Sequence, residues 1–155
     1  MPILRIPLPH PDATSRYAKT LATRLAAGDV ILLHGHVGAG KTHFARSLIQ
    51  SLLESPEDVP SPTFTLVQTY DTVKGEVWHA DLYRITSPDE IEELGLVDAF
   101  HSAICLIEWP DRLGVLAQNT GLDITLTSGL GENEREMNVE WHDPKWGDKL
   151  TAWRP

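Results

Sequence analysis

Apolar positions in the first third of the chain follow two patterns, one typical of helices and one typical of a buried strand. Residues 12–27 carry apolar side chains at helical spacing, and a glycine ends that segment. Residues 30–33 form a continuous apolar run, which predicts a strand buried on both faces of a parallel sheet. A second helical stripe begins near residue 41 and lasts until the pair 55–56. The pattern therefore predicts a helix, a strand, a loop and a helix, in that order.

The rest of the chain contains strand patterns separated by turn residues. Residues 61–70 and 76–82 alternate between polar and apolar side chains, and a lysine-glycine pair separates them, so we expect an antiparallel hairpin. The other predicted elements are a short acidic helix that begins at Ser87, a buried strand at 104–107, and two late, more exposed strands at 124–126 and 137–139.

Length and composition limit the class of protein. The chain has 155 residues, of which 41% are apolar and 23% are charged, so residues 1–155 are expected to form one globular domain. No apolar run approaches the length of a membrane span, and the start lacks a secretory signal, so we expect a cytoplasmic protein without a membrane partner. Cys105 lies in an apolar run, which indicates a buried, inert thiol.

The net charge argues against direct binding of nucleic acids. The chain carries 13 basic and 22 acidic side chains, a formal charge of -9. Such a surface repels a phosphate backbone instead of releasing its counterions, so DNA is not an expected partner. A role connected with RNA would need a partner protein that supplies the basic surface.

The segment between the predicted strand and the second helix has the sequence of a phosphate-binding loop. Residues 35–42 read GHVGAGKT and match G-x-x-x-x-G-K-[ST] at every fixed position. Glycines let the backbone curl with its N–H groups pointing inward, and the helix N-terminus adds partial positive charge. Lys41 can reach the β and γ phosphates of a nucleotide, while the Thr42 hydroxyl can ligate Mg2+. The predicted nucleotide-binding residues are Gly35, His36, Val37, Gly38, Ala39, Gly40, Lys41, Thr42 and His43.

Hydrolysis of a bound nucleotide also needs a carboxylate at the end of a neighbouring strand. Glu108 follows the apolar run at 104–107, which resembles a Walker B segment, and Asp81 ends the second strand of the predicted hairpin. Either residue could instead be an ordinary solvated acid, but the nearby loop favours a functional role. The predicted catalytic residues are Lys41, Asp81 and Glu108, and the predicted metal ligands are Thr42 and Glu108.

A hydroxyl-rich segment at 61–65 could sense the γ-phosphate, because P-loop proteins carry switch segments in this position. It could equally be a turn that enters the hairpin. Trp109 directly follows Glu108 and could pack beside the site or contact a partner. Residues 10–14 and Arg112 are candidate neighbours of the nucleotide base. The candidate switch or partner residues are Ser61, Thr63, Thr65, Trp109 and Arg112.

Four motifs together resemble the TsaE family in their order and spacing. They are GAGKT at 38–42, SPTFTLV at 61–67, HADLYR at 79–84 and IEWP at 107–110. The resemblance is strongest over residues 12–112. It implies a P-loop ATPase that uses ATP and Mg2+, is slow alone, and serves the threonylcarbamoyl modification of an adenosine beside the anticodon of certain tRNAs. It also implies the TsaD and TsaB proteins as partners, through which tRNA would be reached.

The resemblance assigns roles to individual residues. Lys41 and Thr42 would hold phosphate and Mg2+, Glu108 would hold Mg2+ or activate water, Asp81 would belong to the catalytic surroundings, Thr63 would be a switch residue, and Trp109 would lie near the nucleotide or an interface. The chain departs from the usual family loop at His36 and His43, neither of which is a fixed position, so nucleotide binding is still expected. Pattern and resemblance together predict an α/β fold: one P-loop NTPase-like domain with a mostly parallel central sheet flanked by helices, plus an antiparallel hairpin.

Three alternatives differ in what they require. A small-molecule kinase usually opens with its P-loop strand and carries arginines on a lid, whereas here a helix precedes the loop and no arginine-rich lid is visible. A guanine-nucleotide switch would need an Asn-Lys-x-Asp segment, which the sequence lacks. An adaptor that binds nucleotide without hydrolysing it stays open, and a substitution of Glu108 would separate it from an ATPase.

Overall fold

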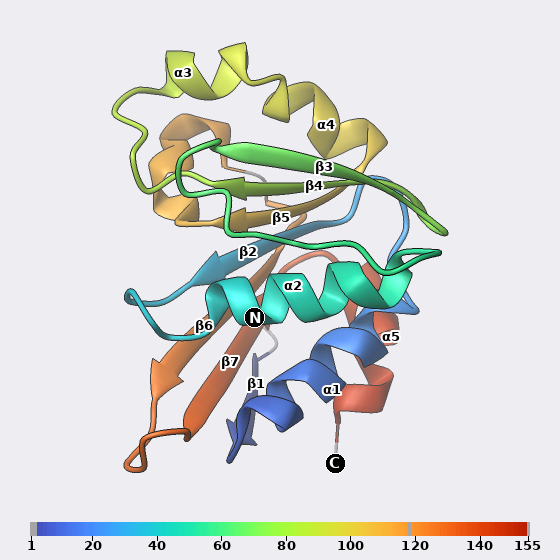
Figure 1. Cartoon of the computed structure of the whole chain (residues 1–155), viewed down its shortest axis with the longest axis vertical. Helices are drawn as coiled ribbons and strands as arrows, with labels where there is room; N and C mark the ends of the chain where they lie inside the picture. Colours follow the sequence, from blue (N-terminus) through green and yellow to red (C-terminus); the bar gives the residue numbers. More distant parts are fainter. Residues whose placement is uncertain (1–2, 118, 155) are drawn as a thin grey trace.

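The computed structural model describes residues 3–117 and 119–154, which build one seven-stranded sheet between two groups of helices (Figure 1). The strands are β1 (Ile3–Leu8), β2 (Val30–His34), β3 (Val67–Thr72), β4 (Gly75–Asp81), β5 (Ile104–Glu108), β6 (Leu122–Ser128) and β7 (Arg135–Trp141). The α-helices are α1 (Pro11–Ala22), α2 (Lys41–Leu52), α3 (Pro88–Glu93), α4 (Leu96–Ser102) and α5 (Lys145–Lys149), and two 3-10 segments are η1 (Pro110–Leu116) and η2 (Thr151–Trp153).

The sheet is parallel in its centre and antiparallel at both edges. Its spatial order is β1-β7-β6-β2-β5-β4-β3. The strand β2 runs parallel to β5 and β6, and β4 runs parallel to β5. On one side β3 and β4 form the hairpin, and on the other β7 pairs antiparallel with β6 and β1. This arrangement confirms the predicted α/β class.

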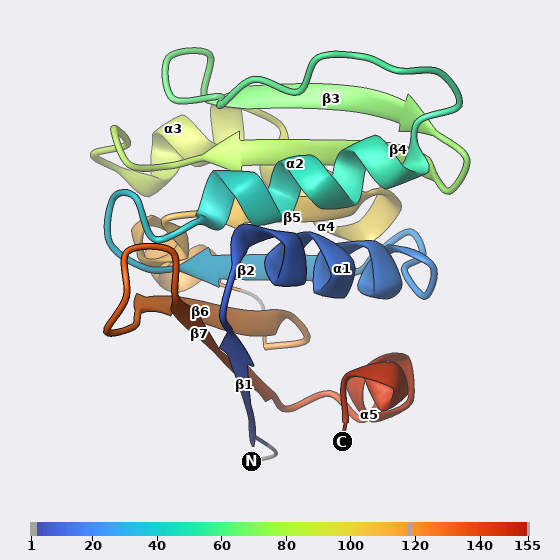
Figure 2. The ribbon, with the colours of Figure 1, turned by 60° about the horizontal axis from the view of Figure 1, so that its bottom comes forward.

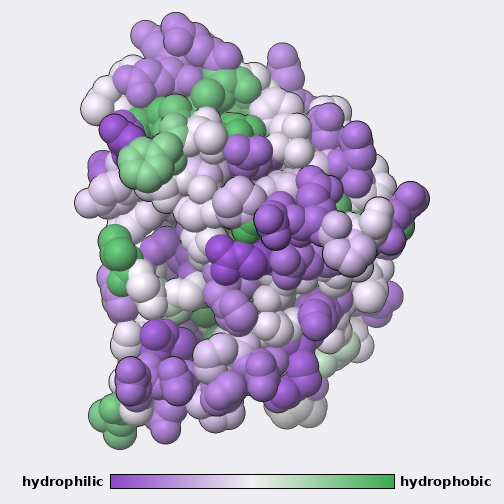
Figure 3. Space-filling view, viewed as in Figure 1, coloured by the Kyte–Doolittle hydropathy of each residue, from purple (hydrophilic) through white to green (hydrophobic). Residues whose placement is uncertain are grey.

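Each face of the sheet is covered by its own helices. Alternate residues of β5 show this division, because Ile104 and Leu106 belong to the apolar core under α1, α2 and α5, whereas Cys105 and Ile107 pack with α3, α4 and η1. In Figure 2, α1 and α2 lie side by side in front of the sheet. The outer surface of that face is mostly hydrophilic (Figure 3). Across residues 3–117 and 119–154, every helix is too short or too polar to span a lipid bilayer.

Two element boundaries differ most from the sequence-based expectation. The first helix ends at Ala22 instead of residue 27, because the Asp29 carboxylate accepts the Ala26 N–H at 2.9 Å and so stabilises a turn there. The hairpin begins at Val67 and not at residue 61. Leu66 has a positive φ of 69° and its N–H reaches back to a carbonyl four positions earlier, so this part of the chain turns.

The late strands are less exposed than their sequence predicts. Ile124, Leu126, Met137 and Val139 are all at most 1% exposed, because they face the core beneath α1 and α5. The edge strand β1 and the helix α4 were not predicted. Since β1 pairs with residues 135–140 of β7, it covers an edge that would otherwise be open for pairing with another chain.

Candidate functional site

Three neighbouring parallel strands end at the same edge of the sheet, where the phosphate-binding loop begins. Leu33 of β2 and Asp81 of β4 both lie opposite Glu108 of β5 in the strand register. The chain leaves β2 after His34, forms the loop, and enters α2 at Lys41. The fold therefore brings the loop and both predicted carboxylates to one edge, as expected for a ligand site of a parallel sheet.

The backbone of the loop is shaped for a compact anion. Gly35 has a φ of 144°, and a Cβ atom there would lie 2.7 Å from the Leu126 carbonyl oxygen, so a side chain does not fit. Gly40 has a φ of 109° and occupies the N-cap position of α2, where no side chain caps the helix. The first N–H groups of α2 therefore lack the usual side-chain acceptor, and a phosphate group at this helix start would supply one.

Lys41 lies inside the loop, and its side chain is held by loop carbonyls. Its ammonium group donates to the carbonyl oxygen of Gly35 and, at 2.9 Å, to that of His36. The same nitrogen lies 4.2 Å from the centre of the Trp109 ring. Burial lowers the pKa of Lys41 below its ordinary value of 10.5, and nearby carboxylates, with Glu108 having the largest effect, offset part of that shift.

Glu108 is buried and connects the first turn of α2 to the sheet. The Thr42 hydroxyl donates to its carboxylate, with distances of 2.8 Å to Oε1 and 3.0 Å to Oε2. On the other side, Nε2 of His79 lies 2.6 Å from Oε2. A hydroxyl and a carboxylate are the hard oxygen donors that Mg2+ prefers. Thr42 and Glu108 thus fit a magnesium ion that would complete its coordination with phosphate oxygens and water.

Asp81 connects the site to the segment that precedes the hairpin. Its Oδ1 accepts the backbone N–H of Tyr83 at 3.0 Å, and its Oδ2 accepts the Thr63 hydroxyl at 3.3 Å. Ser61 and Thr63 join their hydroxyl groups at 2.7 Å. Movement of this segment would therefore change the hydrogen bond between Thr63 and Asp81. Asp81 ends β4, which pairs with β5, the strand that carries Glu108.

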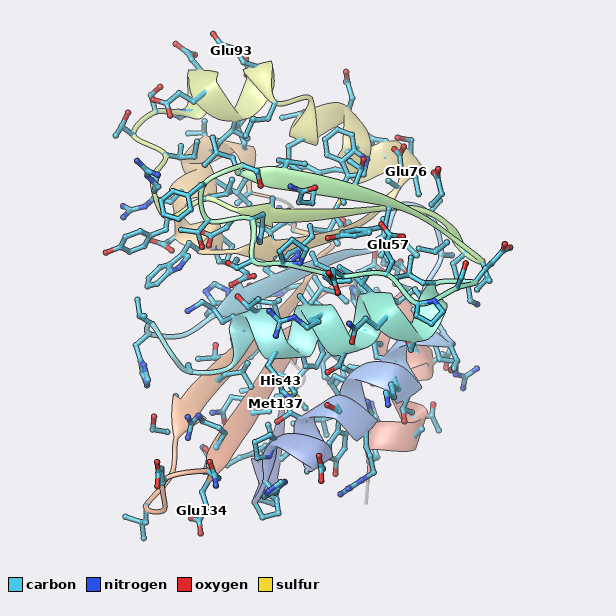
Figure 4. The ribbon with its side chains drawn as sticks, viewed as in Figure 1. His43, Glu57, Glu76, Glu93, Glu134 and Met137 are labelled. Atoms are coloured by element: carbon cyan, nitrogen blue, oxygen red, sulfur yellow. The ribbon has the colours of Figure 1, made fainter. Side chains whose placement is uncertain are left out.

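Two hollows lie on either side of the loop. The larger, of about 450 Å³, is lined by Val37, Gly38, Gly40, Lys41, Thr42, His43, Ser61, Thr63, Asp81, Tyr83, Glu108 and Trp109. The smaller, of about 220 Å³, is lined by Pro11, Thr14, Ala39, Gly40, His43, Asn133 and Arg135. His43 borders both; it belongs to α2, and its ring extends towards α1, where it contacts the Pro11 carbonyl at 3.0 Å (Figure 4).

Other predicted site residues lie outside the larger hollow. Thr65 is exposed and accepts a hydrogen bond from Gln68 at 3.1 Å. Arg112 is exposed, with its guanidinium 5.8 Å from the Tyr83 ring. Residues 10–14 contribute to the smaller hollow through Pro11 and Thr14, whereas Arg112 is not among the residues that line either hollow. The two segments suggested as neighbours of the base therefore do not form one pocket among the described residues.

Trp109 combines an unusual backbone with a position over the loop lysine. Its φ of 60° and ψ of 52° place a large residue in the left-handed region, which costs free energy of the order of 1–3 kcal/mol. Its ring lies 4.7 Å from that of Tyr83 and borders the larger hollow. This strained conformation holds the indole beside Lys41.

Two residues next to the site were not singled out from sequence. His79 could have been suspected, because it alternates with Asp81 and therefore shares its face of β4. Arg135 begins β7, and its guanidinium donates to the Gly38 carbonyl at 3.3 Å, 97 positions away along the chain. No local pattern signals that contact, since it depends on how the β6–β7 hairpin meets the loop.

Comparison with known proteins gives a consistent family match. The model of the family described as threonylcarbamoyl adenosine biosynthesis protein TsaE matches residues 8–137. The chain is 40% identical over 132 residues to a tRNA threonylcarbamoyladenosine biosynthesis protein TsaE of Rickettsia felis, covering 85% of this chain and 77% of that protein. It is 36% identical over 129 residues to the protein of the same name from Bacillus subtilis, covering 83% and 79%. The crystal structure of Bacillus subtilis YdiB is similar, with a TM-score of 0.79, 27% identity, and coverage of 97% of this chain and 93% of that one.

Proposed function

This chain belongs to the TsaE family, whose role lies in tRNA threonylcarbamoyladenosine biosynthesis, and we propose that within this pathway it binds ATP with Mg2+ and hydrolyses it. The observation that carries the proposal is the direct contact of 2.8 Å between the Thr42 hydroxyl and the Glu108 carboxylate. A loop that only held phosphate would not require a buried carboxylate at this position. A carboxylate there can hold Mg2+ or orient the attacking water, which is the chemistry that hydrolysis adds to phosphate binding.

Some residues of the site would bind the nucleotide, and others would take part in its hydrolysis. The N–H groups of the loop and of the first turn of α2 would bind the phosphate oxygens, and Lys41 would neutralise charge on the β and γ phosphates. Thr42 and Glu108 would hold Mg2+, which would supply positive charge to stabilise the phosphates during hydrolysis. The Glu108 carboxylate would orient or deprotonate the attacking water, and Asp81 would complete the polar wall of the hollow.

The two hollows suggest how the whole nucleotide would lie. The triphosphate would occupy the larger hollow, which contains Lys41, Thr42 and Glu108. The base would enter the smaller hollow, which shares Gly40 and His43 with the larger one and is otherwise lined by residues without catalytic chemistry. Arg135 lies in this smaller hollow and could stack on a flat base.

Hydrolysis would then be coupled to partner proteins through the switch segment. Thr63 contacts Asp81 inside the hollow, while Phe64 beside it is 84% exposed. A change at the γ-phosphate could therefore alter an exposed apolar contact surface. We propose the TsaB and TsaD proteins as those partners in the cytoplasm. The formal charge of -9 supports leaving direct contact with tRNA to them.

The test is ATP turnover by the purified protein, alone and with TsaB and TsaD. We expect slow hydrolysis alone and clearly faster hydrolysis with both partners, with a complex that forms in the presence of nucleotide. A Lys41→Ala preparation controls for contaminating ATPases, because it removes the phosphate-binding ammonium. An unchanged rate together with no detectable complex would contradict the proposal.

A further inference from the structure

His79 is a fully buried polar residue, and among the described residues its one hydrogen-bond partner is Glu108. The ring lies on β4, is 0% exposed, and its Nε2 is 2.6 Å from Oε2 of the carboxylate. Because a carboxylate only accepts hydrogen bonds, Nε2 carries the hydrogen and donates it. The second ring nitrogen, Nδ1, is buried and has no hydrogen-bond partner among the residues that the structure describes. Among the described residues, the imidazole therefore makes its hydrogen bond to Glu108 alone.

Packing alone does not account for a histidine at this position. A buried polar atom without a partner costs of the order of 1–3 kcal/mol, and an apolar side chain would fill the same space without that penalty. Val77, two positions earlier on the same face of β4, is apolar and also 0% exposed. The histidine therefore lowers the stability of the fold relative to an apolar side chain. Its hydrogen bond to Glu108 is the feature that offsets this cost.

The strand register explains how the histidine reaches the carboxylate. Asp81 lies opposite Glu108, and His79 lies opposite Leu106, so His79 approaches Glu108 from two pairs further inside the sheet. Thr42 approaches the same carboxylate from the first turn of α2. Glu108 is consequently held from two elements, with Thr42 on the side of the hollow and His79 on the side of the core.

This arrangement fixes the orientation of a carboxylate that has few other restraints. Within residues 3–117 and 119–154, no lysine or arginine nitrogen lies within 4 Å of the Glu108 oxygens. If the Thr42 hydroxyl bound another ligand, the hydrogen bond from His79 would still hold Oε2 in place. Partners of this kind, which orient a group that itself acts, typically alter metal affinity or activity by about 10–100-fold when they are removed.

We propose that His79 is a positioning residue: its Nε2–H holds the Glu108 carboxylate in the orientation needed for ATP hydrolysis and for the metal site. The proposal rests on the function proposed above. It assigns no contact with substrate to His79, which acts only through Glu108.

The test uses two substitutions of His79 and one packing control. His79→Leu keeps an apolar fit but removes the donor, whereas His79→Gln places an amide N–H near the former Nε2. Val77→Ala weakens the core at a neighbouring position of β4 without touching Glu108. Each variant is assayed with TsaB and TsaD for kcat and KM, and its thermal unfolding is recorded.

We expect His79→Leu to lower kcat by about 10–100-fold and to raise KM for ATP in the presence of Mg2+, because the carboxylate acts both in hydrolysis and at the metal site. His79→Gln should recover most of that loss. Val77→Ala should lower the melting temperature but not kcat. Combining His79→Leu with Glu108→Gln should give turnover no lower than Glu108→Gln alone, because both act through one carboxylate. Wild-type turnover in His79→Leu, equal losses in the Leu and Gln variants, or a matching loss in Val77→Ala would overturn the proposal.

A binding measurement separates this proposal from the proposed function. The affinity of a non-hydrolysable ATP analogue is measured with Mg2+ and with a chelator. We expect His79→Leu to lose about tenfold or more of the gain in affinity that Mg2+ gives, with the affinity in chelator unchanged. No loss, or an equal loss in chelator, would overturn the role of His79. If the wild-type protein binds but does not hydrolyse, the ATPase proposal fails while this measurement still decides about His79.

Discussion

The two ends of the central strands each bury a carboxylate, and the two carboxylates have opposite kinds of partner. At the amino end, Asp29 precedes β2 and forms ion pairs with Lys145 at 2.9 Å and Lys149 at 2.6 Å. At the carboxyl end, Glu108 meets a hydroxyl and an imidazole but, among the described residues, no lysine or arginine nitrogen within 4 Å. Both residues are about 2% exposed. Burial of a carboxylate therefore does not by itself distinguish the candidate functional site from a structural position. The kind of side chain that the carboxylate contacts does distinguish them.

The contrast separates a structural end of the sheet from a working end. The lysines that neutralise Asp29 lie on α5, so the ion pairs bind the C-terminal segment to the start of β2. Trp153 joins the C-terminal segment to α1 as well, because its indole N–H donates to the Tyr17 carbonyl at 3.1 Å. At the other end the strands open onto a hollow of about 450 Å³. A buried carboxylate facing such a hollow fits the magnesium ion proposed above.

The largest expected effect is on turnover at the working end. Glu108→Gln keeps the size of the side chain but removes the charge and the ability to accept a proton. We expect kcat with TsaB and TsaD to fall by at least about a hundredfold, equivalent to about 2.7 kcal/mol in the barrier, while nucleotide still binds. Stopped-assay phosphate release and equilibrium nucleotide binding measure the two quantities. Retained turnover would favour a different base, and turnover that is absent even in the wild type would favour an adaptor.

The matched change at the structural end should alter stability and leave turnover intact. Asp29→Asn leaves two lysines without their carboxylate, so we expect a loss of about 3 kcal/mol in the free energy of unfolding, at the lower end for a broken buried pair because both ammonium groups partly reach solvent. Urea denaturation gives this value. Turnover measured well below the melting temperature should equal that of the wild type. If Asp29→Asn lost activity without losing stability, the division between the two ends would be wrong.

A smaller effect concerns Cys105, which lies on β5 between the two ends. Burial raises the pKa of its thiol from 9.0 to about 12. An unfolded thiol ionises near 9 and the folded one does not, so the contribution of this group to stability is complete below pH 9 and is lost as the pH rises towards 12. We expect the stability difference between the wild type and Cys105→Ala to shrink by up to about 1.4 kcal/mol for each pH unit in that window. A difference that stays constant from pH 8 to 11 would show that the thiol is not sealed from water.

The two ends also differ in how far sequence could predict them. The loop was predictable because all its fixed positions fall within residues 35–42, and Glu108 could be suspected because it follows a buried apolar strand. The ion pair of Asp29 with Lys149 joins residues 120 positions apart, so no local pattern contains it. The Asp29 carboxylate also ends the first helix early, which helical periodicity alone could not indicate. The role of His79 could not be predicted for a related reason. Alternation along β4 indicates the face on which His79 lies, but it does not indicate that Glu108 is its partner.

An experiment in cells shows whether the loop end of the sheet serves tRNA modification. The only copy of the gene would carry either Lys41→Ala or Lys149→Ala, which remove a lysine from the working end and from the structural end. Mass spectrometry would then quantify threonylcarbamoyladenosine in total tRNA. We predict that the modification is strongly reduced with Lys41→Ala and close to the wild-type level with Lys149→Ala. Undiminished modification with Lys41→Ala, at normal protein abundance, would contradict the account.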